Sequence, residues 1–293
     1  MTGTIKKILL SASVLASFSA IASAPAFAGT LTGATITGTD IIKYDSKDGY
    51  TYNNPNADLA TILSGDSSNP TGNVELFASS ESNTYKSLTA FNKAPVTSLS
   101  GMIGGKNITF SSLTGLDWFT TDTGSYTTTY GASNLANKWF SEFVSKAAPT
   151  ANANFLYNVF LSNGGFQKSS DANISYVNQD DATGKISFGL AGHSDLNTLY
   201  SFVPKGFQAS EVVKVTYEGK TEYKYNFFAT NSGLYEKGEF DKTGKKSSHS
   251  GNYELTIDGV PPTTESVPEP SAMLGLLGVG GFFAAKRKML KKA

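Results

Sequence analysis

Four side chains whose oxygens could bind a metal ion crowd into six consecutive positions. They are Asn178, Asp180, Asp181 and Thr183. Carboxylate, amide and hydroxyl oxygens are the ligands that calcium prefers in proteins. The spacing is not that of an EF-hand loop, because the alternating acidic positions and the closing glutamate are missing. Asp and Asn also favour β-turns through hydrogen bonds to nearby backbone groups. We therefore predict a turn and no bound cofactor, with calcium binding as the alternative.

Three residue types of a hydrolase triad stand side by side at His193, Ser194 and Asp195. A triad needs its base between nucleophile and orienting acid in space, and consecutive side chains do not converge on one atom. The chain has no G-x-S-x-G elbow and no cysteine. Its other histidine, His249, is distant in sequence, so a zinc site is not indicated. We predict no catalytic residue and no enzymatic activity, and we expect Ser194 to cap a short helix to Phe202.

Tyrosines in predicted strands offer a second kind of chemistry. The predicted strands contain four of them: Tyr217, Tyr223, Tyr225 and Tyr253. A row of exposed, coplanar tyrosine rings stacks on sugar rings, which would make the chain a carbohydrate-binding module. The favoured interpretation is that these rings line the core, with their hydroxyl groups at its edge.

Strand and turn signals dominate the body of the chain, so we predict a mainly β fold, an antiparallel β-sandwich. One hairpin joins residues 99–103 to 106–110 through Gly104 and Gly105, since paired glycines allow the positive φ values of a tight turn.

A second hairpin joins residues 212–217 to 221–229 and places Tyr223, Tyr225 and Phe227 on one aromatic face. Further strands are predicted within 31–52, where glycines mark the turns, and over 73–78, 125–130, 173–178, 185–190 and 252–258.

A helical period interrupts the strands between residue 133 and about residue 164. Apolar residues of 135–147 share one helical face after a cap at Ser133 or Asn134, and a second helix follows over about 153–161. We predict a small helical hairpin packed on the sheet. Asn56 is expected to cap a brief helix over 57–64, and residues 236–250 are expected to form a loop.

The N-terminus has the pattern of a secretory signal peptide over residues 1–28. Lys6 and Lys7 precede an apolar run, and Ala26-Phe27-Ala28 supplies a small-x-small cleavage site at Ala26 and Ala28. We predict export, an extracytoplasmic domain over 29–260, and a Pro/Thr-rich spacer over 261–266.

The C-terminal residues, 267–293, combine three features. Val267-Pro268-Glu269-Pro270-Ser271 is followed by an uncharged apolar run over 272–285 and then by Lys286-Arg287-Lys288. The apolar run predicts a membrane helix, short for a bilayer and extended by lysine side chains that reach the interface. The basic cluster predicts a cytoplasmic C-terminus, with the body on the other side of the membrane.

This order of features resembles the tripartite PEP-CTERM sorting signal of exported bacterial proteins. The resemblance implies that an exosortase, a membrane-embedded protease, recognises Pro268-Glu269-Pro270, removes the helix and passes the body to the cell surface or extracellular matrix. The body, with SYVNQDD at 175–181 and SGNYE at 250–254, is similar to uncharacterised cyanobacterial members of this group, which implies no activity.

Composition and charge limit the partners that the body can be expected to bind. The chain has 24 basic and 24 acidic residues. Two of the basic residues lie in the leader and five in the tail, and one acidic residue lies in the tail. The body therefore has 17 basic and 23 acidic residues and a net charge near −6. Arg287 is the only arginine of the chain. Nucleic acid is therefore not an expected partner, because its recognition relies on clustered cations. We predict a structural protein of the surface or matrix, with a carbohydrate-binding module for exopolysaccharide as the alternative.

Overall fold

The computed structural model describes residues 29–198, 203–238 and 248–262. Within them the fold is mainly β, as predicted, with two sheets and six α-helices. The first sheet has the order β12-β14-β9-β8-β5-β3-β4-β13, with β1 paired to β8, and the second has the order β11-β10-β7-β6-β2. Neighbouring strands are antiparallel, except that β13 runs parallel to β4.

The strands of the first sheet are β1 (Gly29–Thr30), β3 (Ile41–Lys47), β4 (Tyr50–Asn53), β5 (Gly72–Leu76), β8 (Asn173–Gln179), β9 (Ile186–Gly192), β12 (Thr230–Asn231), β13 (Tyr235–Glu236) and β14 (Gly251–Ile257). Those of the second sheet are β2 (Thr32–Thr37), β6 (Ser98–Ile103), β7 (Lys106–Ser111), β10 (Val213–Tyr217) and β11 (Lys220–Lys224). The helices are α1 (Leu59–Ile62), α2 (Leu88–Phe91), α3 (Gly115–Phe119), α4 (Leu135–Ala147), α5 (Ala153–Ser162) and α6 (Gly165–Lys168), with 3-10 turns η1 (Asn83–Tyr85) and η2 (Leu196–Thr198).

Apolar side chains from both sheets form one core between them. Val74 and Leu76 alternate along β5 with Asn73 and Glu75, so that the apolar pair enters this core while the polar pair faces the other side. The rings of Phe110 on β7 and Phe188 on β9 meet across the two sheets, with centroids 5.0 Å apart. Burial of these alternating residues fixes the register of the strands.

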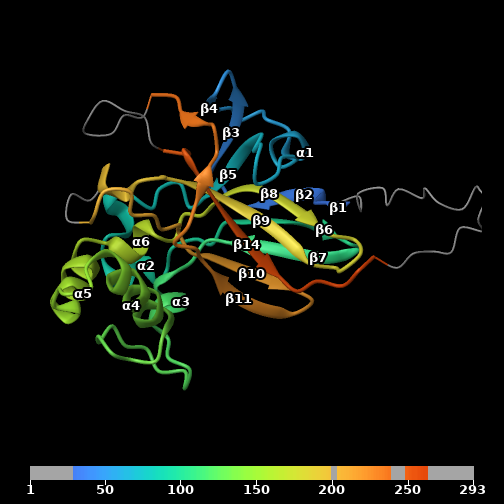
Figure 1. Ribbon diagram of the computed structural model, residues 1–293. Coiled ribbons are helices and arrows are strands. Elements are labelled where there is room, and N and C mark those ends of the chain that lie inside the picture. The colour runs from blue at the N-terminus through green and yellow to red at the C-terminus, as the bar shows by residue number, and fades with distance from the viewer. Residues whose placement is uncertain (1–28, 199–202, 239–247, 263–293) are drawn as a thin grey trace, which may run out of the picture. The chain divides into compact units, whose positions relative to one another are not determined.

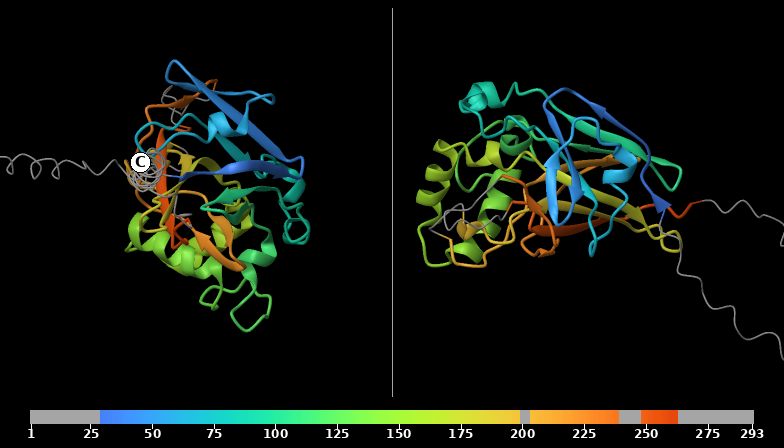
Figure 2. Two further views of the ribbon diagram at one scale, coloured as in Figure 1. Left: turned by 90° about the vertical axis from the view of Figure 1, so that its right-hand side faces the viewer. Right: turned by 90° about the horizontal axis from the view of Figure 1, so that it is seen from above.

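The helices have a core of their own, built mainly from aromatic rings. Trp118 of α3 packs edge-on against Trp139 of α4 at 5.7 Å, and Phe166 of α6 lies 5.1 Å from Trp118. Trp118 also donates a hydrogen bond from its indole nitrogen to Ser170 over 2.7 Å. Figures 1 and 2 show α3 to α6 gathered at one end of the two sheets. The predicted hairpin is therefore present as α4 and α5, but it belongs to a larger helical layer.

The described body begins and ends at the opposite end of the sheets from these helices (Figure 1). Gly29 pairs with Gln179 in the first sheet, and the Gln179 side chain donates to the carbonyl oxygen of Val260 over 2.8 Å. Gln179 is fully buried, so both ends of the body are fastened at one point.

Both predicted hairpins are present, with one shortened. Gly104 and Gly105 have φ values of 56° and 78° between β6 and β7, as a tight primed turn requires. The second hairpin is β10–β11, but β11 ends at Lys224. Tyr225 and Phe227 follow it outside the sheet and pack against the helical core, so the predicted aromatic face continues beyond the strand.

Several local predictions were wrong. Residues 125–130 form a loop rather than a strand, with an isolated bridge at Tyr126. Asp58, and not Asn56, caps the first helix by accepting from the Thr61 amide over 2.9 Å. At η2 the Asp195 carboxylate, and not Ser194, accepts from the Asn197 amide.

The predicted termini lie outside the described residues. These are the signal peptide with Ala26 and Ala28, the sorting residues 267–271, the apolar run 272–285 and the basic cluster 286–288. Among the residues that are described, no helix has the length and apolar character needed to cross a bilayer.

Candidate functional site

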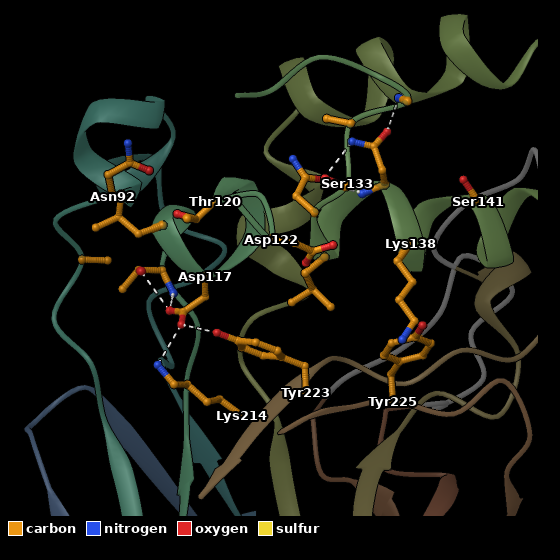
Figure 3. Close-up of a pocket in the computed structure, with 18 of the residues that line it drawn as sticks. Asn92, Asp117, Thr120, Asp122, Ser133, Lys138, Ser141, Lys214, Tyr223 and Tyr225 are labelled. Carbon is orange, nitrogen blue, oxygen red and sulfur yellow. Dashed lines mark hydrogen bonds and ion pairs between the residues drawn. The ribbon is translucent and has the colours of Figure 1, made fainter. Parts of the chain in front are cut away.

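An open cleft of about 1100 Å³ lies where the helical layer meets the second sheet. α3 forms one wall, and the loop over 120–134 with the start of α4 forms the other. Lys214 of β10, together with Tyr223 and Tyr225, lies at its base (Figure 3). The cleft is thus assembled from parts of the chain that are about a hundred residues apart.

Asp117 is the polar centre of this base. It belongs to a capping box at the start of α3, where its Oδ2 accepts from the backbone nitrogen and the hydroxyl group of Thr114, both over 2.9 Å. Its Oδ1 accepts from the Lys214 ammonium group and the Tyr223 hydroxyl group, both over 2.8 Å (Figure 3). One carboxylate therefore joins a helix to two strands.

These bonds keep Asp117 ionised. Burial alone would raise its pKa, but hydrogen bonds from Lys214, Thr114 and Tyr223 outweigh burial and lower it. Both carboxylate oxygens are occupied, so Asp117 positions the cleft and is a poor general acid.

Two asparagines hold the loop that forms the second wall. Asn134 caps α4 by accepting from the Asn137 amide over 3.0 Å, and its own amide group donates to Thr127. Asn137 donates to the Thr129 carbonyl oxygen and accepts from the Gly131 amide. Both asparagines are buried, and their side-chain amides make the hydrogen bonds to the loop's backbone that a neighbouring strand would make in a sheet.

Exposed groups line the upper part of the cleft. Asp122, Ser133, Lys138 and Ser141 are exposed, and the structure shows no ion pair for Asp122 or Lys138 among the described residues. Tyr225 is half-buried and donates from its hydroxyl group to Glu142 over 2.9 Å, which fixes its ring. The cleft therefore presents donors, acceptors and an aromatic side chain to solvent (Figure 3).

The structure divides the four tyrosines predicted as either core or sugar-stacking residues. Tyr217 and Tyr253 are buried in the core between the sheets. Tyr223 and Tyr225 are half-buried and line the cleft. The core interpretation holds for the first pair, and the second pair is available to a ligand.

The oxygen-rich segment forms the predicted turn between β8 and β9. Oδ1 of Asp180 accepts from the amides of Ala182 and Thr183 over 2.9 and 3.2 Å, and these bonds lower the pKa of Asp180. Asp181 accepts weakly from Gly29, while the Asn178 amide donates to Gly65. No group of three His, Asp or Glu side chains within the described ranges is placed to hold a metal ion. Calcium binding at Asn178, Asp180, Asp181 and Thr183 stays a prediction.

The adjacent His193, Ser194 and Asp195 do not assemble a triad with one another. The Ser194 hydroxyl group lies 2.8 Å from the Ser250 hydroxyl group, and the Asp195 carboxylate caps η2. The His193 carbonyl oxygen accepts from Tyr253 over 2.5 Å. The segment is a bonded turn at the end of β9.

Sequence reasoning named Tyr223 and Tyr225 but missed Thr114, Asp117 and Lys214, which build the base of the cleft with them. Thr114-x-x-Asp117 has the spacing of a capping box, so the start of α3 could have been found. Its pairing with Lys214 and Tyr223 depends on contacts over about a hundred residues and has no local signal.

Comparison with known proteins identifies the C-terminal segment. Residues 266–288 match the model of the PEP-CTERM protein-sorting motif. The match contains the predicted sorting residues and reaches Lys288, so the predicted resemblance to PEP-CTERM proteins is confirmed. The motif implies export, membrane-anchored transit and processing by an exosortase. The similarity of the body to cyanobacterial members stays a prediction. No curated protein and no solved structure matches the chain.

Proposed function

We propose that this chain, which carries a PEP-CTERM sorting motif, is an exported protein whose body binds a polysaccharide of the cell envelope or extracellular matrix in the cleft of Figure 3. The observation that carries this proposal is the composition of the cleft. Exposed hydroxyl, ammonium and carboxylate groups line the cleft together with Tyr225, whose ring is held in place by Glu142. Sugar hydroxyl groups both donate and accept hydrogen bonds, and sugar rings pack on aromatic faces.

The size and openness of the cleft suit a chain better than a single sugar. Its volume of about 1100 Å³ is at the upper end of ordinary small-molecule sites. Thr120, Asp122, Ser133 and Lys138 along its rim are exposed, so a polymer would enter and leave without a conformational change.

We propose binding without turnover. Glycoside hydrolysis by two carboxylates needs one that is protonated near neutral pH. The carboxylates lining the cleft are Asp117 and Asp122, and hydrogen bonds lower the pKa of Asp117. Asp122 is exposed on the rim of the cleft.

The test is binding of the full chain, purified in mild detergent, to the extracellular polysaccharide of the producing cell. We expect saturable binding that falls several-fold in Tyr225→Ala, because this variant removes the ring on which a sugar would pack. Lys138→Ala should weaken binding of an acidic polymer only. Tyr235→Ala, which removes an exposed ring from β13, is the matched control and should bind normally. Absence of binding, or equal binding by the Tyr225 and Tyr235 variants, would favour the structural role without a ligand site.

A further inference from the structure

A second cavity, distinct from the cleft, lies between the outer face of the first sheet and the helical layer. Its volume is about 420 Å³, within the range of small-molecule sites. Five acidic residues line it: Glu75, Glu81, Asp171, Glu211 and Glu236. They come from separate parts of the chain, so the fold and not the local sequence gathers them. We call this cavity the acidic chamber.

Positive charge in the lining does not balance these acids. Lys168 lines the chamber, but the ion pairs found among the described residues involve neither Lys168 nor the acids of the chamber. His193 and His249 line it as well. Nδ1 of His249 lies 2.7 Å from the Thr51 hydroxyl group and 3.3 Å from the Asn73 amide nitrogen, so the ring is hydrogen-bonded on its Nδ1 side. Burial lowers the pKa of His249 to about 3, so the ring is neutral.

Three oxygens of the lining lack a donor. Oδ1 of Asp171, Oδ1 of Asn173 and Oε2 of Glu211 are each buried with no hydrogen-bond partner in the described structure. Asn173 is 8% exposed, and its amide nitrogen donates a long hydrogen bond, 3.3 Å, to the Asp171 carbonyl oxygen. Unpartnered buried acceptors are costly, so these three oxygens favour a donor that enters the chamber.

Part of the lining is aromatic. Trp139, Phe143 and Phe160 line the chamber, with the Trp139 and Phe143 rings stacked at 5.3 Å. Trp139 is 2% exposed, and its indole N–H has no acceptor among the described residues. Aromatic faces attract organic cations, and the indole N–H needs an oxygen.

We propose that the acidic chamber binds a primary ammonium group carried on a hydroxylated body, the chemistry of an amino sugar. The ammonium group would donate to the oxygens of Asp171, Asn173 and Glu211, and the ring would lie against the aromatic part of the lining. A hydroxyl or ring oxygen would accept from Trp139. A bare metal ion fits less well, because no three of the described His, Asp or Glu side chains are placed around one point.

The electrostatics of the chamber agree with a cationic ligand. Burial and then the nearby Glu236, Glu211 and Glu81 raise the pKa of Glu75 to about 8, although a hydrogen bond from Tyr44 opposes them. Burial raises the pKa of Glu211 to about 7, and burial with Glu211 and Glu75 raises that of Asp171. A bound ammonium group would stabilise the ionised carboxylates, so binding should release protons near pH 7.

The test is calorimetric titration of the full chain, in mild detergent at pH 7.5, with glucosamine. Glucose and N-acetylglucosamine are the uncharged matched probes, a glucosamine disaccharide tests whether the group can belong to a chain, and CaCl₂ is the metal probe. We expect glucosamine to bind at least tenfold more tightly than either uncharged sugar. The heat should differ between phosphate and HEPES buffers, which carry no primary amine, because protons are released. Binding of the disaccharide would identify a polymer end as the source, and its exclusion would identify the free sugar.

Variants separate this site from the cleft. Glu211→Gln and Asp171→Asn should each weaken glucosamine at least tenfold, while Glu218→Gln, an exposed control, should not. Tyr225→Ala should leave glucosamine binding unchanged, so the cleft can fail without the chamber failing. If a carboxamide variant does not fold, Asn173→Ser removes one unpartnered oxygen without changing charge and should weaken binding. Equal affinity for glucose and glucosamine, no binding of either, or calcium binding that the same variants abolish would overturn the proposal.

Discussion

The Tyr223 hydroxyl group donates to Oδ1 of Asp117 over 2.8 Å, although the two residues are 106 positions apart. This bond ties β11 of the second sheet to the first turn of α3. Lys214 of the neighbouring strand shares the same oxygen. The base of the cleft is therefore one bonded unit, and its geometry depends on a single carboxylate.

Asp117→Ala should destabilise the fold and open the cleft. It removes the capping box and leaves Lys214, whose side chain is one-third exposed, without its partner. We expect a loss of roughly 2–3 kcal/mol in the free energy of unfolding, measured with urea. Glu218→Ala breaks the exposed pair with Lys106 and should cost less than about 1 kcal/mol. Equal losses would mean that Asp117 does not hold the cleft together.

The same variant has a pH signature. Because the pKa of Asp117 is lowered in the folded state, its stabilising effect is present above the pKa of an unfolded aspartate, about 3.9, and is lost as the pH falls below it. The stability difference between the wild type and Asp117→Ala should therefore be constant from pH 5 to 7 and shrink below pH 4. A difference independent of pH would show that the lost cap, not the charge, matters.

The acidic chamber predicts the opposite dependence for the ligand-free protein. Carboxyl groups with raised pKa hold protons in the folded state that the unfolded state has lost, so the free energy of unfolding falls as the pH rises from about 4.5 toward 7 for Glu211 and 8 for Glu75. Each group contributes at most about 1.4 kcal/mol per pH unit.

His249 acts in the other direction, but below pH 6.5, where the unfolded chain takes up a proton that the buried ring does not. Between pH 7 and 8 Glu75 titrates alongside Glu211 and Asp171, because burial also raises the pKa values of those two groups. Urea unfolding should show stability falling across this interval in the wild type and in Glu211→Gln, and a flatter profile in Glu75→Gln. A wild-type profile already flat between pH 7 and 8 would contradict the raised pKa.

The two glycines of the β6–β7 turn should differ in their tolerance of alanine. Both have positive φ, which costs an alanine about 1 kcal/mol. A Cβ at Gly105 meets open space, whereas one at Gly104 would collide with the amide of the buried Gln179. Gly105→Ala should therefore lower stability by about 1 kcal/mol and Gly104→Ala by at least twice as much. Thermal unfolding checks this, and similar midpoints would show that Gln179 can move.

Local patterns predicted most elements of the fold but not the sites. Val74 and Leu76 showed which face of β5 enters the core, and Asn134 marked the start of α4. The same alternation leaves the polar residue Glu75 on the opposite face of β5. That face is covered by segments near Asp171 and Glu211, which only long-range packing brings there. The alternating pattern reports which face is apolar, but not what lies over the polar face.

The strand predicted over 125–130, within the loop over 120–134, was wrong for a related reason. Its Ser, Thr and Tyr residues have high strand propensity, yet propensity measures fit to a pleated surface and no neighbouring strand is present. The amides of Asn134 and Asn137 satisfy the loop's backbone instead. An asparagine in a sequence predicts a cap or a turn equally well, so this substitution of side-chain bonds for a ladder could not be foreseen.

Replacement of Pro268, Glu269 and Pro270 by alanine should keep the chain in the inner membrane. The three residues lie within the matched sorting motif, and an exosortase that recognises them would no longer release the body. Fractionation of cells should then show the full-length chain in the membrane and little in the medium or at the surface. Substitution of Thr263 and Thr264, which precede the motif, is the control and should leave release unchanged. Normal release of the triple-alanine variant would mean that the motif does not direct processing. Retention with intact polysaccharide binding would show that sorting and recognition are separate functions of the two parts of the chain.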